Sequence, residues 1–325
     1  RTRSEIWFTS NYLRQVKQAV MLLSERNLYL AQTGQTEALF DATQTAIGIT
    51  ACLDTQPQLI DHLVAIALKA MVAADVENSL NLMSFSEPQL ATLQAQFHHM
   101  HPTDSLVAGL VTERAEMIDL MQAPTDDFMQ AYGPGGFPFN AVHALYTLSG
   151  LKAKDAVLLA DYYDRMIQIA QSPPHEQAAK LKKLEAKVTS YPVYHWGFHI
   201  VRPALTKVAQ INLRVIGGLR CAETGLAIER YRQKHQALPD SLEALVPEFI
   251  DQVYRDPFDG KPLRYVRHAD GGFTVYHIGE DAIDNGGLSR EQMPAKTGTR
   301  NPAEHDWPFT VRREPAPPGT PLRQQ

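Results

Sequence analysis

The chain has 325 residues, of which 44% are hydrophobic and 21% are charged, and its formal net charge is −5 at pH 7. Such a composition is typical of a globular protein with one large domain or two ordinary ones. The acidic balance, with no stripe of basic side chains to neutralise phosphates, excludes nucleic acid as the expected partner. Cys52 and Cys221 are too few for a disulfide framework, and their apolar, helix-like surroundings predict two buried free thiols. The alternative, in an oxidising compartment, is a single bridge between them.

Residues 1–202 carry the pattern of a helical array. Apolar side chains recur at helical spacing from the start of this region, as in Leu13, Val16, Val20 and Leu23. A proline in the first turn marks several helix starts, among them those near Pro88 and Pro174. The predicted helices are joined by short polar turns and follow no fixed repeat length, so we expect an irregular antiparallel bundle or α-solenoid.

The segment 132–139 interrupts this helical pattern. Its sequence, YGPGGFPF, holds three Gly and two Pro residues and cannot continue a helix. We predict a loop, which is either a long surface connection or a ligand-facing segment. Asp126, Asp127 and Asp161 offer carboxylates near this loop, and paired carboxylates can do acid–base work where they meet.

A long helix is predicted over Pro203–His235, where apolar residues form a nearly continuous stripe. Gly217 and Gly218 weaken this helix by about 1 kcal/mol each relative to Ala and indicate a close packing contact. After Leu238 the pattern changes to short strand-like runs bounded by Gly and Asp, so we expect strands only after Pro262.

The expected fold class is therefore α+β. A mostly α-helical array, 1–202, is followed by a small antiparallel-sheet module packed on the long helix, 203–314. We expect Leu226 in the interface between that helix and the sheet. Residues 315–325, which include the sequence PAPPGTP, are expected to form an extended tail that packs in no core.

Residues 220–312 carry several short motifs in a fixed order. Residues 231–239 read YRQKHQALP, 256–260 read DPFDG and 276–287 read YHIGEDAIDNGG. This region resembles the globular domain of the type II secretion major pseudopilins, in which a long helix ends in a Tyr-rich turn before Leu-Pro. An Asp-Pro-Trp-Gly turn and a Gly-Gly loop follow in that family, and Asp306 with the next residue is similar to the Asp-Ile that opens its last strand. We name no family for the helical region.

The pseudopilin resemblance implies a calcium site in the acidic loop. The corresponding side-chain ligands are Asp281, Asp284 and Asp306. Loop carbonyls would complete the roughly six to eight oxygen ligands that calcium takes at about 2.3–2.6 Å. Ala282 stands where the family has Gly. The alternative is an ordinary turn whose Asp and Asn side chains bond their own backbone.

Two groups of histidines are further candidates for metal chemistry. The segment 98–101, HHMH, lies at a predicted helix end with no carboxylate at ligand spacing, so we interpret its histidines as helix-end or solvated side chains. His195 and His199 have the i, i+4 spacing of zinc-binding helices but lack the Glu that would act as a base. Gly197 disfavours a helix there, and the aromatic neighbours predict a packed junction.

The sequence holds no Ser nucleophile elbow, Walker loop or dinucleotide fingerprint. We therefore expect a non-catalytic interaction or assembly protein of the bacterial cell envelope, in the periplasm or attached to the envelope. It would bind a protein partner and use the pseudopilin-like module, with calcium, as a docking unit. The alternative is a metal-dependent hydrolase with a site between the helical array and the Gly133–Gly136 loop.

Membrane contact is expected only through a removed N-terminal segment. No apolar run approaches the length of about 18 residues that a membrane span needs. The chain begins at Arg1 without Met, so an anchor or signal segment could have preceded it.

Overall fold

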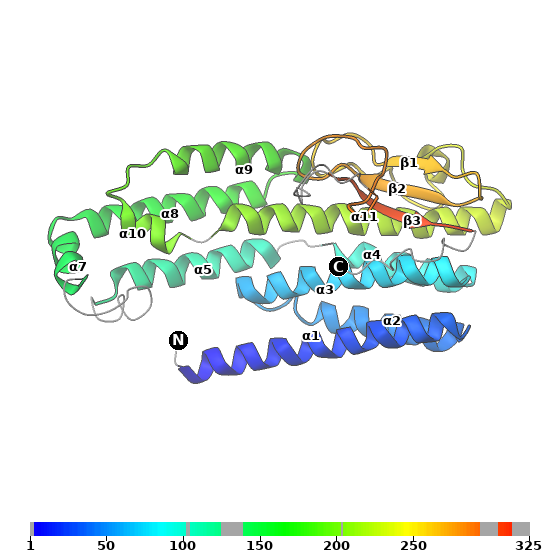
Figure 1. Ribbon diagram of the computed structural model, residues 1–325, viewed down its shortest axis with the longest axis horizontal. Helices are drawn as coiled ribbons and strands as arrows, with labels where there is room; N and C mark the ends of the chain where they lie inside the picture. The colour runs from blue at the N-terminus through cyan, green and yellow to red at the C-terminus, as the bar shows by residue number, and fades with distance from the viewer. Residues whose placement is uncertain (1–2, 102–104, 125–138, 203, 293–304, 314–325) are drawn as a thin grey trace.

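The computed structural model describes residues 3–101, 105–124, 139–202, 204–292 and 305–313. Helices dominate these residues, and one small sheet follows them (Figure 1). The helices are α1 (Arg3–Gln32), α2 (Thr36–Ala51), α3 (Leu59–Leu82), α4 (Glu87–Met100), α5 (Ser105–Gln122), α7 (Phe139–Leu148), α8 (Leu151–Ala170), α9 (Pro174–Thr189), α10 (Trp196–Val201), α11 (Leu205–His235) and the short 3-10 helix η1 (Leu242–Leu245). The strands are β1 (Arg264–Arg267), β2 (Phe273–His277) and β3 (Trp307–Val311).

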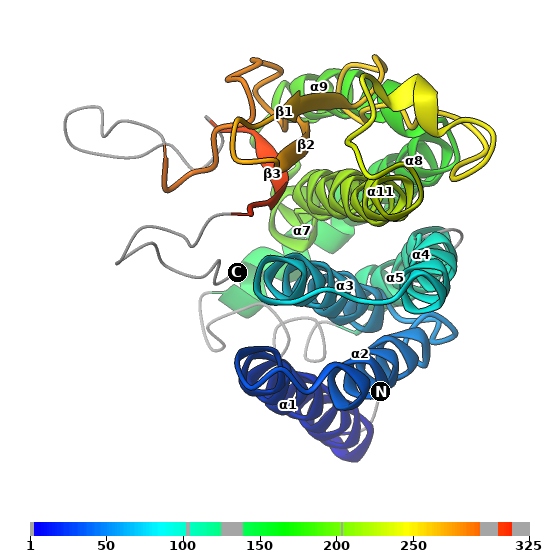
Figure 2. The ribbon, with the colours of Figure 1, turned by 90° about the vertical axis from the view of Figure 1, so that its right-hand side faces the viewer.

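The elements stack in layers, which the end-on view shows most clearly (Figure 2). α1 and α2 form one outer layer, and α3, α4 and α5 lie on it. α11 and α8 form the next layer, and the sheet and α9 cover its far side. The expected α+β fold, a helical array followed by a small antiparallel sheet packed on a long helix, is confirmed.

Local sequence explains where the helices begin. At the start of α4, Gln89 Oε1 accepts a hydrogen bond from the backbone N–H of Ser86 at 2.9 Å, and Pro88 occupies the first turn. A side chain that satisfies an otherwise unpaired N–H fixes the helix start. α9 begins at Pro174, where the missing N–H of proline costs no helical hydrogen bond.

α11 contributes to both hydrophobic cores of the molecule. Its second half, with Leu219 and Leu226, packs in a core with α1, α2, α3, α4 and the sheet. Its first half, with Leu205 and Leu213, packs in a second core with α5, α8 and α9. The helix that the apolar stripe predicted is therefore the element that joins the two cores.

The sheet has the order β1-β2-β3 and is antiparallel throughout. β2 and β3 pack against α11, and Leu226 is fully buried in the same core as Phe273 and Phe309, as predicted. A Cβ at Gly217 would lie 2.5 Å from the ring of His277, whereas one at Gly218 would meet nothing within 4 Å. The predicted close contact is therefore confirmed at Gly217 alone.

The outer edge of β3 is covered by α3. The backbone N–H of Thr310 donates to the carboxylate of Glu77 at 2.8 Å. Because an unpaired strand edge exposes backbone donors and acceptors, a side chain in this position protects the sheet from pairing with another strand. The first part of the chain thereby holds the last strand in place.

Two expectations about single residues are wrong. Cys52 is exposed, because it lies just beyond the last residue of α2, while Cys221 is buried as predicted. Gly197 lies inside the short helix α10. A Cβ there would overlap the hydroxyl of Tyr146, so close packing and not helix propensity selects glycine.

Strands begin at Arg264, and no strand precedes it in the part of the chain that the structure describes. The Gly133–Gly136 loop, Asp126, Asp127 and the tail 315–325 lie outside the described residues. Within the described ranges, no helix combines the length and the apolar character needed to cross a membrane.

Candidate functional site

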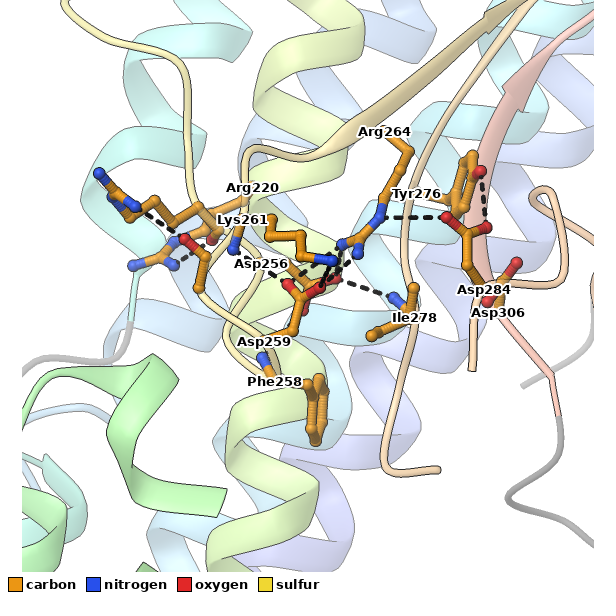
Figure 3. Close-up of polar contacts among 12 residues, drawn as sticks. Arg220, Asp256, Phe258, Asp259, Lys261, Arg264, Tyr276, Ile278, Asp284 and Asp306 are labelled. Atoms are coloured by element: carbon orange, nitrogen blue, oxygen red, sulfur yellow. Dashed lines mark hydrogen bonds and ion pairs between the residues drawn. The ribbon is translucent and has the colours of Figure 1, made fainter. Parts of the chain in front are cut away.

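The acidic loop in which calcium was predicted follows β2 and lies beside β1 (Figure 3). Its backbone turns through left-handed conformations, with φ of 58° at Ala282, 70° at Gly286 and 80° at Gly287. The left-handed region is disfavoured for residues with a Cβ. Ala282 thus adopts a backbone conformation that favours Gly.

Arg264 lies at the centre of a group of carboxylates (Figure 3). Its guanidinium lies 2.5 Å from Asp256 and 2.5 Å from Asp259. Its Nε lies 3.5 Å from Asp284. Burial acts to raise the pKa of Asp259, but hydrogen bonds from Arg264 and the backbone outweigh it and hold the pKa below the usual value. Arg264 therefore balances the negative charge of the aspartates on this side of the loop.

Asp256 ties the DPFDG turn to the end of β2. Its Oδ1 accepts from the backbone N–H of Phe258 at 2.8 Å, and its Oδ2 accepts from that of Ile278 at 2.9 Å. The side chain is completely buried, and this burial raises its pKa in spite of the hydrogen bonds. The turn and the acidic loop are consequently one connected structure.

Asp306 is the most unusual of the predicted calcium ligands. It is completely buried, and its Oδ2 accepts from the backbone N–H groups of Asn285 at 2.9 Å and Gly287 at 2.8 Å. Its Oδ1 is buried with no hydrogen-bond partner among the described residues. Burial, with the charges of Asp284 and Asp281, raises the pKa of Asp306 to about 6. A buried carboxylate oxygen without a donor is costly unless a proton or a cation satisfies it.

The other two predicted ligands also cap the loop backbone. Asp284 Oδ1 accepts from the hydroxyl of Tyr276 at 3.0 Å and from the N–H of Gly286 at 3.0 Å. Asp281 Oδ1 accepts from the N–H of Ile283 at 3.2 Å. These hydrogen bonds are the contacts expected of an ordinary turn, in which Asp side chains bond to their own backbone. The same side chains would therefore serve in the turn and in a calcium site.

The loop holds the oxygen types that calcium prefers, but they do not surround one point. Across the described ranges, no group of three or more His, Cys, Asp or Glu side chains is arranged as a metal site. The unsatisfied Oδ1 of Asp306 is the atom that fits a bound cation best. Calcium would draw on this oxygen, on Asp281 and Asp284, and on loop carbonyls.

A second polar cluster joins α4 to α11 and to the segment before the DPFDG turn. Glu223, buried in α11, accepts from His98 Nδ1 at 3.2 Å, from His101 Nε2 at 2.9 Å and from the hydroxyl of Tyr254 at 2.7 Å. No carboxylate lies at ligand spacing from these histidines in the sequence, and the one that meets them comes from a distant helix. His98 is largely exposed, as predicted, but His101 is mostly buried, with 19% of its side chain exposed.

A third cluster lies where α8 meets α10. Asp155, completely buried, accepts from His195 Nδ1 at 2.5 Å, from the hydroxyl of Tyr146 at 2.5 Å and from the N–H of Phe198 at 3.0 Å. The predicted packed junction is confirmed, since the rings of Tyr191 and Phe198 pack edge to face. Sequence reasoning missed Asp155. It also left Asp161 as a possible partner of another carboxylate, whereas Asp161 pairs with Arg165 and Lys187.

A groove runs along the boundary between the helical array and the sheet module. It has a volume of about 760 Å³ and is partly open to solvent. Its lining includes Ala178, Leu181, Glu185 and Thr189 of α9, Gln210 of α11, and Phe258. We call it the junction groove.

Comparisons of the chain with protein-family models, with curated proteins and with solved structures gave no match.

Proposed function

We propose that this protein is a non-catalytic interaction or assembly protein of the bacterial cell envelope. In this proposal the helical array and the pseudopilin-like module together present a binding surface to a protein partner. The junction groove is the observation that supports it best, because its walls come from both parts of the chain. Binding sites commonly lie in such concave boundaries between structural units.

The walls of the groove are held by ion pairs. Glu185 on one wall lies 3.1 Å from Arg202, and Glu280 on the other lies 2.5 Å from Arg214. Ala178 and Ala186 supply accessible apolar surface, and the lining also includes the largely buried Leu181 and Phe258. A preorganised groove with an apolar floor and polar walls suits an extended protein segment, because little entropy is lost in ordering the site.

Calcium is the proposed ligand of the acidic loop, with Asp281, Asp284 and Asp306 as its side-chain ligands. The buried, unsatisfied Oδ1 of Asp306 supports this assignment. An ion bound there would join the loop after β2 to the residue that precedes β3. The module would then be a stiffer docking unit with the ion than without it.

Site-specific photo-crosslinking in cells that naturally make the protein tests the proposal. A photoreactive residue at Thr189, which lines the groove, should give one discrete crosslinked protein in the envelope fraction. The same residue at Thr45, exposed on α2, is the control and should not. Ala186→Trp, which fills the groove, should abolish the crosslink from Thr189. Equal crosslinking from both positions, or recovery of the protein in the cytoplasmic fraction, would contradict the proposal.

The alternative function is a metal-dependent hydrolase with a site between the helical array and the Gly133–Gly136 loop, and the Asp155–His195 pair is the observation that favours a hydrolase. Asp155 holds Nδ1 of His195 at 2.5 Å, which orients the imidazole as a carboxylate does in acid–base catalysis. The loop expected to form the other side of this site lies outside the described residues. A panel of ester and peptide substrates separates the two functions: activity lost in His195→Gln and kept in His199→Gln would favour the hydrolase.

A further inference from the structure

We propose that His98, His101 and Glu223 bind a divalent first-row transition metal ion, of the zinc, nickel or copper class. This site is separate from the acidic loop and from the junction groove, and it does not depend on the proposed function. It would join the end of α4, where His98 lies in the last turn and His101 follows the last helical residue, to α11, which carries the glutamate.

The spacing of the donor atoms suits such an ion. The nitrogens of His98 and His101 lie 3.2 and 2.9 Å from the oxygens of Glu223. A metal with bonds of about 2.0–2.1 Å to imidazole nitrogen and carboxylate oxygen separates neighbouring ligands by about 3.0–3.4 Å. Each of these hydrogen-bonded nitrogen–oxygen pairs therefore has about the separation of two ligands on one ion.

The cluster needs a small rearrangement to bind. No three such side chains of the described residues already surround a common point, because the two nitrogens contact different oxygens of Glu223. His98 can rotate, since 57% of its side chain is exposed. Each coordinating nitrogen must present its lone pair to the metal, so the proton of each neutral imidazole would reside on the other ring nitrogen.

The surroundings of Glu223 favour a metal ligand of fixed orientation. The hydroxyl of Tyr254 donates to Oε1 at 2.7 Å, which is the kind of outer contact that orients ligating carboxylates. The side chain of Glu223 is 4% exposed, while that of His101 is 19% exposed. The ion would thus enter from the solvent side past His98 and rest on a buried anion. The guanidinium of Arg220, which lies over the ring of Tyr254, is a nearby positive charge that would repel the metal ion.

The donor set also predicts selectivity. Two imidazoles and one carboxylate suit zinc, nickel and copper, whereas calcium prefers oxygen ligands alone. Calcium should therefore leave this site empty. His99 provides an internal reference, because it belongs to the same histidine run but makes no contact with Glu223 among the described residues.

The test uses the full chain without an affinity tag, stripped of metal with EDTA and titrated calorimetrically with ZnCl₂ or NiCl₂. We expect one ion per chain and no displacement by millimolar calcium. His98→Gln and His101→Gln should each weaken binding at least tenfold, while His99→Gln should leave it unchanged. With Cu²⁺, electron paramagnetic resonance should show coupling to two imidazole nitrogens in the wild type and to one in His98→Gln.

The proposal would be overturned if no binding is detected at about 0.1 mM metal, which is on the order of the weakest dissociation constant of a specific site. Equal metal affinity in the His98→Gln and His99→Gln variants would also overturn it, as would a copper spectrum without nitrogen coupling. His98 is exposed, so its variant is expected to fold. The comparison therefore holds even if the Glu223 or His101 variants are unstable.

Discussion

Asn81 of α3 bonds to the outer edge of β3 through both ends of its amide, as a neighbouring strand would. Its Nδ2 donates to the carbonyl of Thr310 at 2.8 Å. Its Oδ1 accepts from the N–H of Arg312 at 2.6 Å. With Glu77, Asn81 thus replaces a fourth strand and fastens the sheet module to the helical array.

Removal of this contact should weaken the attachment of β3. We expect Asn81→Ala to lower the free energy of unfolding by about 1–2 kcal/mol, since a typical hydrogen bond contributes about 0.5–1.5 kcal/mol. Asn81→Asp should do at least as much harm, because its carboxylate cannot donate to Thr310. Urea denaturation measures both, with Asn78→Ala on the same helix as the control. Equal midpoints for the Asn81 and Asn78 variants would show that α3 does not hold the strand.

Gly217 and Gly218 offer a matched pair with opposite expected signs. A Cβ at Gly217 would lie 2.5 Å from His277, but a Cβ at Gly218 would meet nothing within 4 Å. Gly218→Ala should stabilise the protein by up to about 1 kcal/mol through helix propensity. Gly217→Ala should destabilise it, because the ring of His277 is buried and stacked on Phe258. Differential scanning calorimetry distinguishes the two, and shifts of the same sign would contradict the packing described.

Leu226→Ala tests the interface between α11 and the sheet. Leu226 is completely buried among Phe273, Phe309 and their neighbours. Truncation of a buried Leu typically costs about 2–5 kcal/mol. The melting temperature should fall clearly, and an unchanged value would mean that α11 does not dock on the sheet.

Asp306 should make stability depend on pH and on calcium. Its pKa in the folded protein is raised to about 6 from the ordinary value of 3.8, so the folded state binds a proton that the unfolded state releases. The contribution of this group to stability is therefore fully present below about pH 4 and is lost as the pH rises from about 4 through 6. Above pH 7, Asp306→Asn in EDTA should be at least as stable as the wild type, because no buried charge remains.

Calcium should reverse that order. If the ion binds the acidic loop, the wild type gains RT ln(1 + [Ca²⁺]/Kd), or about 2.7 kcal/mol at a hundredfold excess over Kd. Asp306→Asn and Asp284→Ala should gain much less. Melting curves in EDTA and in millimolar calcium at pH 7.5 measure this. Identical gains in the three proteins, or no gain in any, would leave the loop as an ordinary turn.

His62 should give the opposite pH dependence. Burial, together with the positive charge of Lys69, lowers the pKa of His62 to about 4 from 6.5. Below about pH 6.5 the unfolded state binds a proton that the folded state refuses, so stability falls as the pH drops from 6.5 towards 4. The loss is about 3 kcal/mol at most, at 1.36 kcal/mol for each pKa unit. His62→Asn should flatten this part of the stability profile, and parallel profiles for variant and wild type would contradict it.

Periodic patterns predicted the helices and the sheet module well, because helices and strands each bury apolar side chains at a characteristic spacing. The apolar stripe of residues 203–235 correctly predicted the long α11, and the change of period after Leu238 correctly predicted where strands begin. The polar clusters were less predictable. Glu223 lies 122 residues beyond His101, and Arg264 meets its three aspartates only after the module has folded. Such pairings leave no periodic trace in the sequence, so the acidic loop was found only through its resemblance to pseudopilins, and its calcium stays a prediction.

α11 is a single uninterrupted helix with one half in each core. Neither core can lose its share of this helix without exposing apolar surface in the other, so the chain is expected to melt in one cooperative transition. Protease cleavage after His235 should not release a stable sheet fragment, because that fragment would leave behind the helix on which its strands rest. A force applied to one core would likewise be transmitted to the other core along α11, because this rigid helix belongs to both.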